Sequence, residues 1–107
     1  MKIDIHKRAC LLANKTGGMS GPAIKPVALR MVYQVCQAVD VPVIGVGGIQ
    51  NADDVLEFLS AGASAVQVGA QNLVDPWACP RIIEELPRKM DEYGIETLEE
   101  IIGRAQK

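Results

Sequence analysis

The segment VPVIGVGGI at residues 41–49 decides the fold class of this sequence. It is continuously apolar, rich in β-branched side chains, and shows no alternation of polar and apolar positions. This pattern predicts a parallel strand whose two faces are both buried under helices. A second run of the same kind, AVQVG at residues 65–69, follows further along the chain and also ends in glycine. We therefore expect two neighbouring parallel strands.

Helical patterns flank both strands. Pro26 suits the first turn of a helix that reaches Asp40, because the N–H that proline lacks has no partner at that position. Between the strands, Asn51 is a good N-cap, and Gly62 is the expected residue just after the helix end. Alternating helices and strands define an α/β unit with right-handed crossovers. Since two parallel strands cannot bury themselves, the unit needs neighbours on both sides.

The two ends of the chain carry shorter patterns. Residues 3–14 contain two short extended runs that predict a β-hairpin. Asp75 and Pro76 are expected to start another helix, which Pro87 should kink or split and Gly94 should end. Thr97 is expected to open a capping box for a short last helix.

Composition excludes several functional classes. The 11 Lys and Arg residues against 13 Asp and Glu residues give a net charge of −2, and the basic residues are scattered, which argues against binding of nucleic acid. No apolar run approaches the ~18 residues of a membrane span. The N-terminus has no signal-peptide pattern, so a cytoplasmic location is expected. Reduced thiols are expected at Cys10, Cys36 and Cys79, because no CxxC pair occurs and His6 is the single histidine.

Three glycine clusters occupy comparable places in the chain. Residues 17–21 lead towards the first helix, Gly47 and Gly48 end the first strand, and Gly69 with Ala70 ends the second. The C-terminal ends of barrel strands commonly carry phosphate sites, in which backbone N–H groups hold the anion. Any one cluster is more typical of a tight turn, but the three together favour phosphate binding. Their spacing matches neither the G-x-G-x-x-G dinucleotide fingerprint nor a Walker A loop.

Four motifs extend these patterns: ANKTGGMSGPAIKP at 13–26, IGVGGI at 44–49, AGASAVQVG at 61–69 and DPWACPRIIEEL at 75–86. In these motifs and their spacing the sequence resembles dihydroorotate dehydrogenases of the class 1B, NAD-linked type. The resemblance implies a partial TIM (β/α)₈ barrel, made of the last two βα units with a preceding β-hairpin and C-terminal helices. Residues 1–107 would then be a single C-terminal segment of that barrel and not a complete domain.

The resemblance also implies a cofactor. The family binds FMN at the top of the barrel and oxidises dihydroorotate to orotate in de novo pyrimidine biosynthesis. Where this sequence has Ala70, the family usually has threonine, whose hydroxyl adds a hydrogen bond worth about 1 kcal/mol. The residues that match the family's binding site for the flavin phosphate are Gly21, Gly47, Gly48, Gly69 and Ala70.

The family's catalytic cysteine, its substrate-binding asparagines and its flavin-side lysine lie upstream of the matched motifs and have no counterpart here. We assign no catalytic residue and no metal ligand, and expect the chain alone to be inactive, with weak or absent FMN binding. The implied partners are the remainder of the barrel and an iron–sulfur/FAD electron-transfer subunit. Two alternatives are a non-catalytic truncated βα fragment and a flavin-domain segment of a dihydropyrimidine dehydrogenase. Uncovered strand edges and apolar faces predict self-association.

Overall fold

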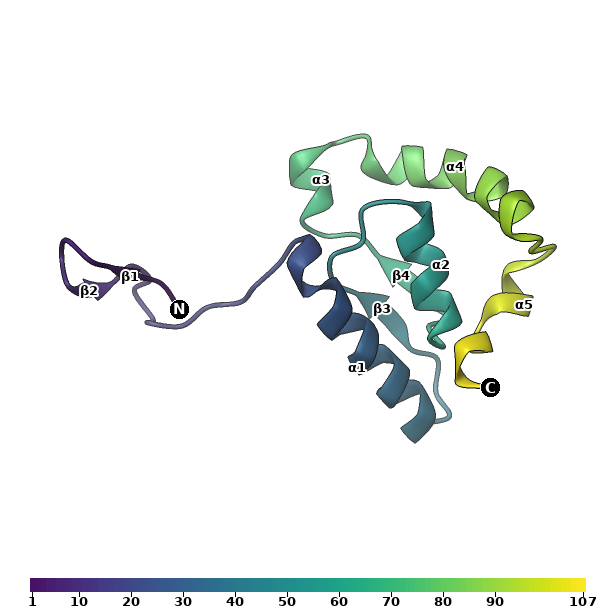
Figure 1. The fold of residues 1–107 in the computed structure, drawn as a ribbon, viewed down its shortest axis with the longest axis horizontal. Coiled ribbons are helices and arrows are strands. Elements are labelled where there is room, and N and C mark those ends of the chain that lie inside the picture. The colour runs from purple at the N-terminus through teal and green to yellow at the C-terminus, as the bar shows by residue number, and fades with distance from the viewer.

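The computed structural model describes residues 1–107, which form a projecting arm and a folded body (Figure 1). In the arm, residues 1–20, every residue except Asp4 is exposed. All of the buried residues lie in the body, residues 21–107. The arm explains why the radius of gyration is 16.7 Å, when a compact chain of this length should have about 13 Å.

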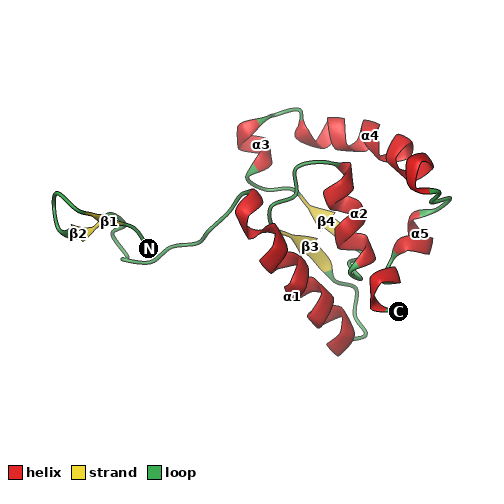
Figure 2. Cartoon of the chain, viewed as in Figure 1, coloured by secondary structure: helices red, strands yellow, loops and turns green.

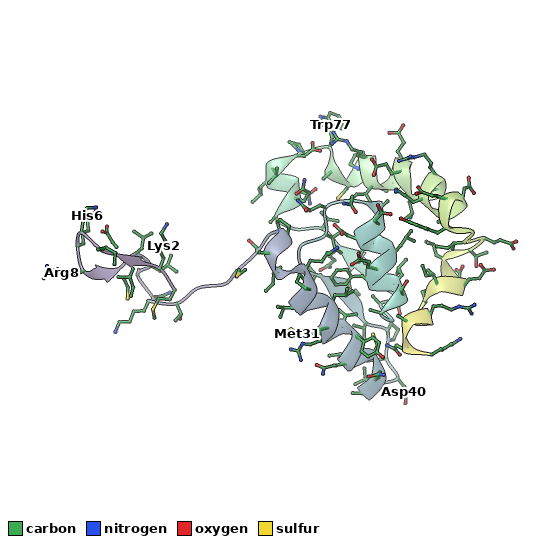
Figure 3. The ribbon with its side chains drawn as sticks, in the orientation of Figure 1. Lys2, His6, Arg8, Met31, Asp40 and Trp77 are labelled. Carbon is green, nitrogen blue, oxygen red and sulfur yellow. The ribbon has the colours of Figure 1, made fainter.

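The arm carries the predicted β-hairpin. Strands β1 (Ile3–Asp4) and β2 (Ala9–Cys10) pair antiparallel, which confirms the prediction, although each strand has only two residues. The carboxylate of Asp4 accepts hydrogen bonds from the backbone N–H groups of His6 and Lys7, at 3.0 and 3.1 Å. These bonds shape the turn, with His6 at its tip (Figure 3).

The body is built on two parallel strands, β3 (Ile44–Val46) and β4 (Ala65–Gln67), joined by helix α2 (Ala52–Ser60). This confirms the predicted pair of parallel strands. The first strand is shorter than the apolar segment 41–49 because Gly47 and Gly48 take positive φ angles of 133° and 75°, which turn the chain out of the extended conformation.

The expectation that both faces of these strands are buried is wrong. Helices α1 (Lys25–Ala38) and α2 flank the two strands (Figure 2). They cover one and the same face, because Gly45 lies against Phe58 of α2 and Gly47 lies against Ala28 of α1. On the opposite face, Ile44 and Val46 are 54% and 51% exposed. No helix of this chain therefore covers the face of β3 that carries Ile44 and Val46.

The core lies between α1, α2 and helix α4 (Ala78–Tyr93). Phe58 is fully buried at its centre, and Ile82 contributes the apolar side of α4. Two shorter helices, α3 (Gln71–Val74) and α5 (Leu98–Ile101), precede and follow α4. At 16 residues α4 is the longest helix, and no helix combines the length and hydropathy required to cross a bilayer.

Helix α4 differs from the sequence prediction at two points. It begins at Ala78 and not at Asp75, because the Asp75 carboxylate accepts the Trp77 N–H at 3.0 Å and forms a separate turn. Pro87 lies inside the helix without splitting it. The carbonyl of Ile83 loses its helical partner there, but Ile83 is 71% exposed, so water can replace the missing donor.

Candidate functional site

Three loops meet at the C-terminal ends of β3 and β4. Gly21 from the loop before α1, Gly48 from the loop after β3, and Gly69 and Ala70 from the loop after β4 line one pocket of about 40 Å³. Four of the five predicted site residues therefore lie together, although their clusters are widely separated in the sequence. The other residues that line the pocket are Pro22, Ile49, Gln50, Gln71 and Val74.

Gly48 is the position at which two of these loops touch. Its φ angle of 75° disfavours any side chain. A Cβ atom there would also lie 2.8 Å from the carbonyl oxygen of Gly21 and 2.9 Å from the backbone N of Lys25. Both neighbours are backbone atoms, so they cannot move aside as a flexible side chain would. Glycine is required at this position because it allows the loops to approach closely.

The pocket offers main-chain donors. The backbone N–H groups of Gly21, Gly48, Gly69 and Ala70 donate to no acceptor within the chain. Unpaired backbone amides gathered in loops can hold an anion without any basic side chain. No Lys or Arg side chain lines the pocket. The arrangement fits a small anion such as a phosphate group, bound by neutral donors.

Gly47 is the predicted site residue that the structure places elsewhere. It does not line the pocket. A Cβ atom on Gly47 would lie 2.6 Å from the Cβ of Ala28, so this glycine allows α1 to pack against the end of β3. The sequence showed two adjacent glycines, but only the backbone geometry separates their roles.

A buried ion pair behind the pocket was not predicted. Asp54 is 6% exposed, and its Oδ1 accepts a hydrogen bond from Lys25 Nζ at 2.6 Å. Its Oδ2 accepts one from the backbone N–H of Gln50 at 2.8 Å. The hydrogen bond to Asp54 raises the pKa of Lys25 above its usual value. No pattern in the sequence linked Asp54 to a lysine so far upstream.

A second side-chain contact joins two of the loops. Gln50 Nε2 donates to Gln71 Oε1 at 3.2 Å, so the loop after β3 contacts the start of α3. The sequence could have indicated that Gln50 lies at the pocket, because it comes two residues after Gly48. Helix α3 was not predicted, because a four-residue helix leaves no periodic pattern.

A larger groove of about 1280 Å³ lies between α1, α2 and the C-terminal segment, away from the glycine loops. Asp53 lines it and is paired, to Tyr93 Oη at 2.9 Å and to Lys89 Nζ at 3.2 Å. The hydrogen bond from Tyr93 lowers the pKa of Asp53 below its usual value. These contacts attach α4 to α2. Because the groove contains none of the glycine loops, we place the candidate site at the smaller pocket.

The structure brings together no group of three or more His, Cys, Asp or Glu side chains that could hold a metal ion. The three cysteines are free thiols. Burial raises the pKa of the Cys36 thiol, which disfavours the reactive thiolate.

Comparison with known proteins identifies the family. A family model described as dihydroorotate dehydrogenase matches residues 1–90. The chain is 62% identical over 107 residues to the catalytic subunit of dihydroorotate dehydrogenase B (NAD(+)) from Halalkalibacterium halodurans, and 57% identical to that of a Geobacillus species. Both alignments cover all of this chain. They cover 35% of the Halalkalibacterium protein and 34% of the Geobacillus protein. The chain therefore spans about a third of these relatives.

The fold is also similar to a solved structure. A dihydroorotate dehydrogenase from Eimeria tenella, crystallised in complex with ferulenol, superposes with a TM-score of 0.79 at 28% identity. The match covers 91% of this chain and 27% of the other. With the family model matching residues 1–90 and relatives aligned over all 107 residues, the chain belongs to the dihydroorotate dehydrogenase family.

Proposed function

We propose that this chain is the C-terminal segment of a dihydroorotate dehydrogenase barrel that holds the phosphate end of FMN. The observation that carries the proposal is the pocket in which Gly21, Gly48, Gly69 and Ala70 present unpaired backbone amides from three loops. FMN, when bound, supplies the redox chemistry of dihydroorotate oxidation to orotate in de novo pyrimidine biosynthesis. This chain's residues contribute binding and orientation.

The exposed apolar surfaces support a partial (β/α)₈ barrel. Val27, Met31 and Val35 follow one another at four-residue spacing along α1 and are 42%, 52% and 46% exposed. This stripe includes Met31, labelled in Figure 3, and it is placed to receive a neighbouring helix. Ile44 and Val46 form a second exposed face, on the side of the sheet away from the helices. In a barrel, that face is the packed interior.

The remainder of the barrel is therefore the first proposed partner, and an iron–sulfur/FAD electron-transfer subunit is the second. The name of the relatives, a catalytic subunit, supports the second partner. We propose that the chain alone does not oxidise dihydroorotate. The pocket is lined by glycine, alanine, valine, isoleucine, proline and glutamine, which include no general base.

Titration of the ¹⁵N-labelled chain with FMN tests the phosphate site. NMR detects the millimolar binding expected of an incomplete barrel. FMN should shift the amide signals of Gly21, Gly48, Gly69 and Ala70, whereas riboflavin, which lacks the phosphate, should not. Inorganic phosphate should shift the same amides. Equal effects of FMN and riboflavin at these four signals would refute the proposal.

A second candidate function is a non-catalytic fragment that self-associates. The exposed α1 stripe and the uncovered face of β3 favour it, because large apolar patches and unpaired strand edges associate. Sedimentation velocity over a range of protein concentrations should show species larger than 11.5 kDa. A single monomeric species at every concentration, with a cooperative thermal transition, would contradict this candidate.

A further inference from the structure

We infer that Asp54 is the positioning residue of the phosphate pocket, because its buried carboxylate holds the loop after β3 against the start of α1. The inference rests on the proposed function. It identifies the residue that keeps the three loops of the pocket together. Asp54 is the single charged residue among the buried residues of the chain. A carboxylate is stable in such a place only when its oxygens are paired, and both oxygens of Asp54 are.

The two oxygens contact two different elements. Oδ1 accepts from Nζ of Lys25, at the start of α1, and Oδ2 accepts from the backbone N–H of Gln50, two residues after Gly48. The backbone N–H of Asp54 donates to Asn51 Oδ1 at 2.9 Å, which fixes the first turn of α2. One side chain thus joins the start of α1, the loop after β3 and the start of α2.

Both partners of Asp54 lead directly to the pocket. A Cβ atom on Gly48 would lie 2.9 Å from both the backbone N and the Cβ of Lys25. The position of Lys25 therefore determines how much room there is beside Gly48. Gln50 lines the pocket, and its side chain donates to Gln71, the residue at the start of α3 directly after Ala70, at 3.2 Å. Through Lys25 and Gln50, Asp54 influences all three loops that carry the unpaired amides.

Asp53 provides a matched control. It is the neighbouring residue on the same helix and also forms an ion pair, with Lys89 at 3.2 Å, but it is not near the pocket. D53N and D54N make the same chemical change at adjacent positions. An effect that D54N shows and D53N does not is therefore caused by the location of Asp54 and not by the loss of one negative charge.

The first measurement uses the ligand-free chain. In D54N the amide oxygen should face the Lys25 ammonium, which would repel the NH₂ group, so the NH₂ group takes the place of the oxygen that accepts from Gln50 and cannot accept a hydrogen bond. Amide exchange at Gln50 should become about tenfold faster, the effect of losing one hydrogen bond to a charged group. The NMR signals of Gly21 and Gly48 should also shift, while D53N leaves them unchanged. An unaltered exchange rate at Gln50 with unshifted glycine signals would overturn the inference.

A double variant covers the case in which D54N does not fold. K25M/D54M removes both charges together, so no unpaired charge stays buried. It still lacks the acceptor for Gln50 and should show the same faster exchange. Retained protection of the Gln50 amide in this variant would likewise overturn the role of Asp54.

The second measurement separates positioning from general stability. D54N should weaken FMN binding about tenfold and leave riboflavin binding unchanged, because only FMN carries the phosphate. A purely structural role would weaken both ligands equally, and that result would overturn the inference. If the unaltered chain binds FMN and riboflavin equally well, the proposed function fails, whereas the exchange rate at Gln50 still decides what Asp54 does.

Discussion

Replacement of Gly48 by alanine should destabilise the body by about 2–4 kcal/mol. The φ angle of 75° places the new residue in the left-handed region, at a cost of about 1–2 kcal/mol for an L-residue. The added Cβ would lie 2.8 Å from the Gly21 carbonyl oxygen and 2.9 Å from the Lys25 backbone N. Overpacking against atoms that cannot turn away costs a further ~1–3 kcal/mol. These two effects overlap in part, because the loop can relieve both by one movement.

Urea unfolding followed by circular dichroism at 222 nm measures this change in the free energy of unfolding. Gly69→Ala is the matched control, since its Cβ meets no atom within 4 Å and its φ angle is not in the positive range. The control should lie within about 0.5 kcal/mol of the unaltered chain. All samples need the same protein concentration, because association would shift the midpoint. Equal stabilities for Gly48→Ala and Gly69→Ala would refute the argument that the loops require glycine.

Three further outcomes are expected. Phe58→Ala should lose about 3–5 kcal/mol in the same urea assay, because this fully buried side chain fills the space above Gly45; a loss below ~1 kcal/mol would contradict the described core. Ala70→Thr should tighten FMN binding about fivefold through one added hydrogen bond, measured by NMR titration, with no effect on riboflavin. Tyr93→Phe should reduce stability most between the ordinary pKa values of Asp53 and Tyr93, 3.8 and 10.0. The hydrogen bond lowers the pKa of Asp53 and raises that of Tyr93, so its contribution fades as pH falls below 3.8 or rises above 10.0. Urea midpoints of both proteins across pH should converge at these extremes, and a difference that is independent of pH would refute the assignment.

Local sequence patterns predicted the elements that form through local interactions. The side chain of Asn51 accepts the Asp54 N–H as an N-cap should, and Gly62 takes its left-handed conformation just after α2. Gly94 ends α4 with a φ angle of 66°. Each of these residues acts within one turn of its own helix, so the sequence contains the whole interaction.

Other predictions fared less well, one of them local and the rest dependent on distant residues. The capping box at Thr97 lacks its side-chain hydrogen bond, and Glu100 instead accepts the backbone N–H of Glu96 at 3.2 Å. The two-sided burial of β3 was wrong because α1 and α2 pack on the same face, and an apolar run does not reveal on which side of a strand the helices lie. The Lys25–Asp54 pair was missed because a contact across 29 positions has no periodic signature. The alternation of strands and helices predicted that the glycine loops lie at the same ends of neighbouring strands, and the pocket lined by Gly21, Gly48, Gly69 and Ala70 agrees with that prediction.

A pocket built from peptide groups has no acid or base of its own. None of its nine lining residues titrates, so protonation of the protein cannot directly switch the site on or off. If the proposed phosphate monoester is the ligand, its second ionisation near pH 6 is the titration inside the pocket that would change binding near neutral pH. A doubly charged phosphate should be held better than a singly charged one, and the neutral amides would respond to that change without altering their own state.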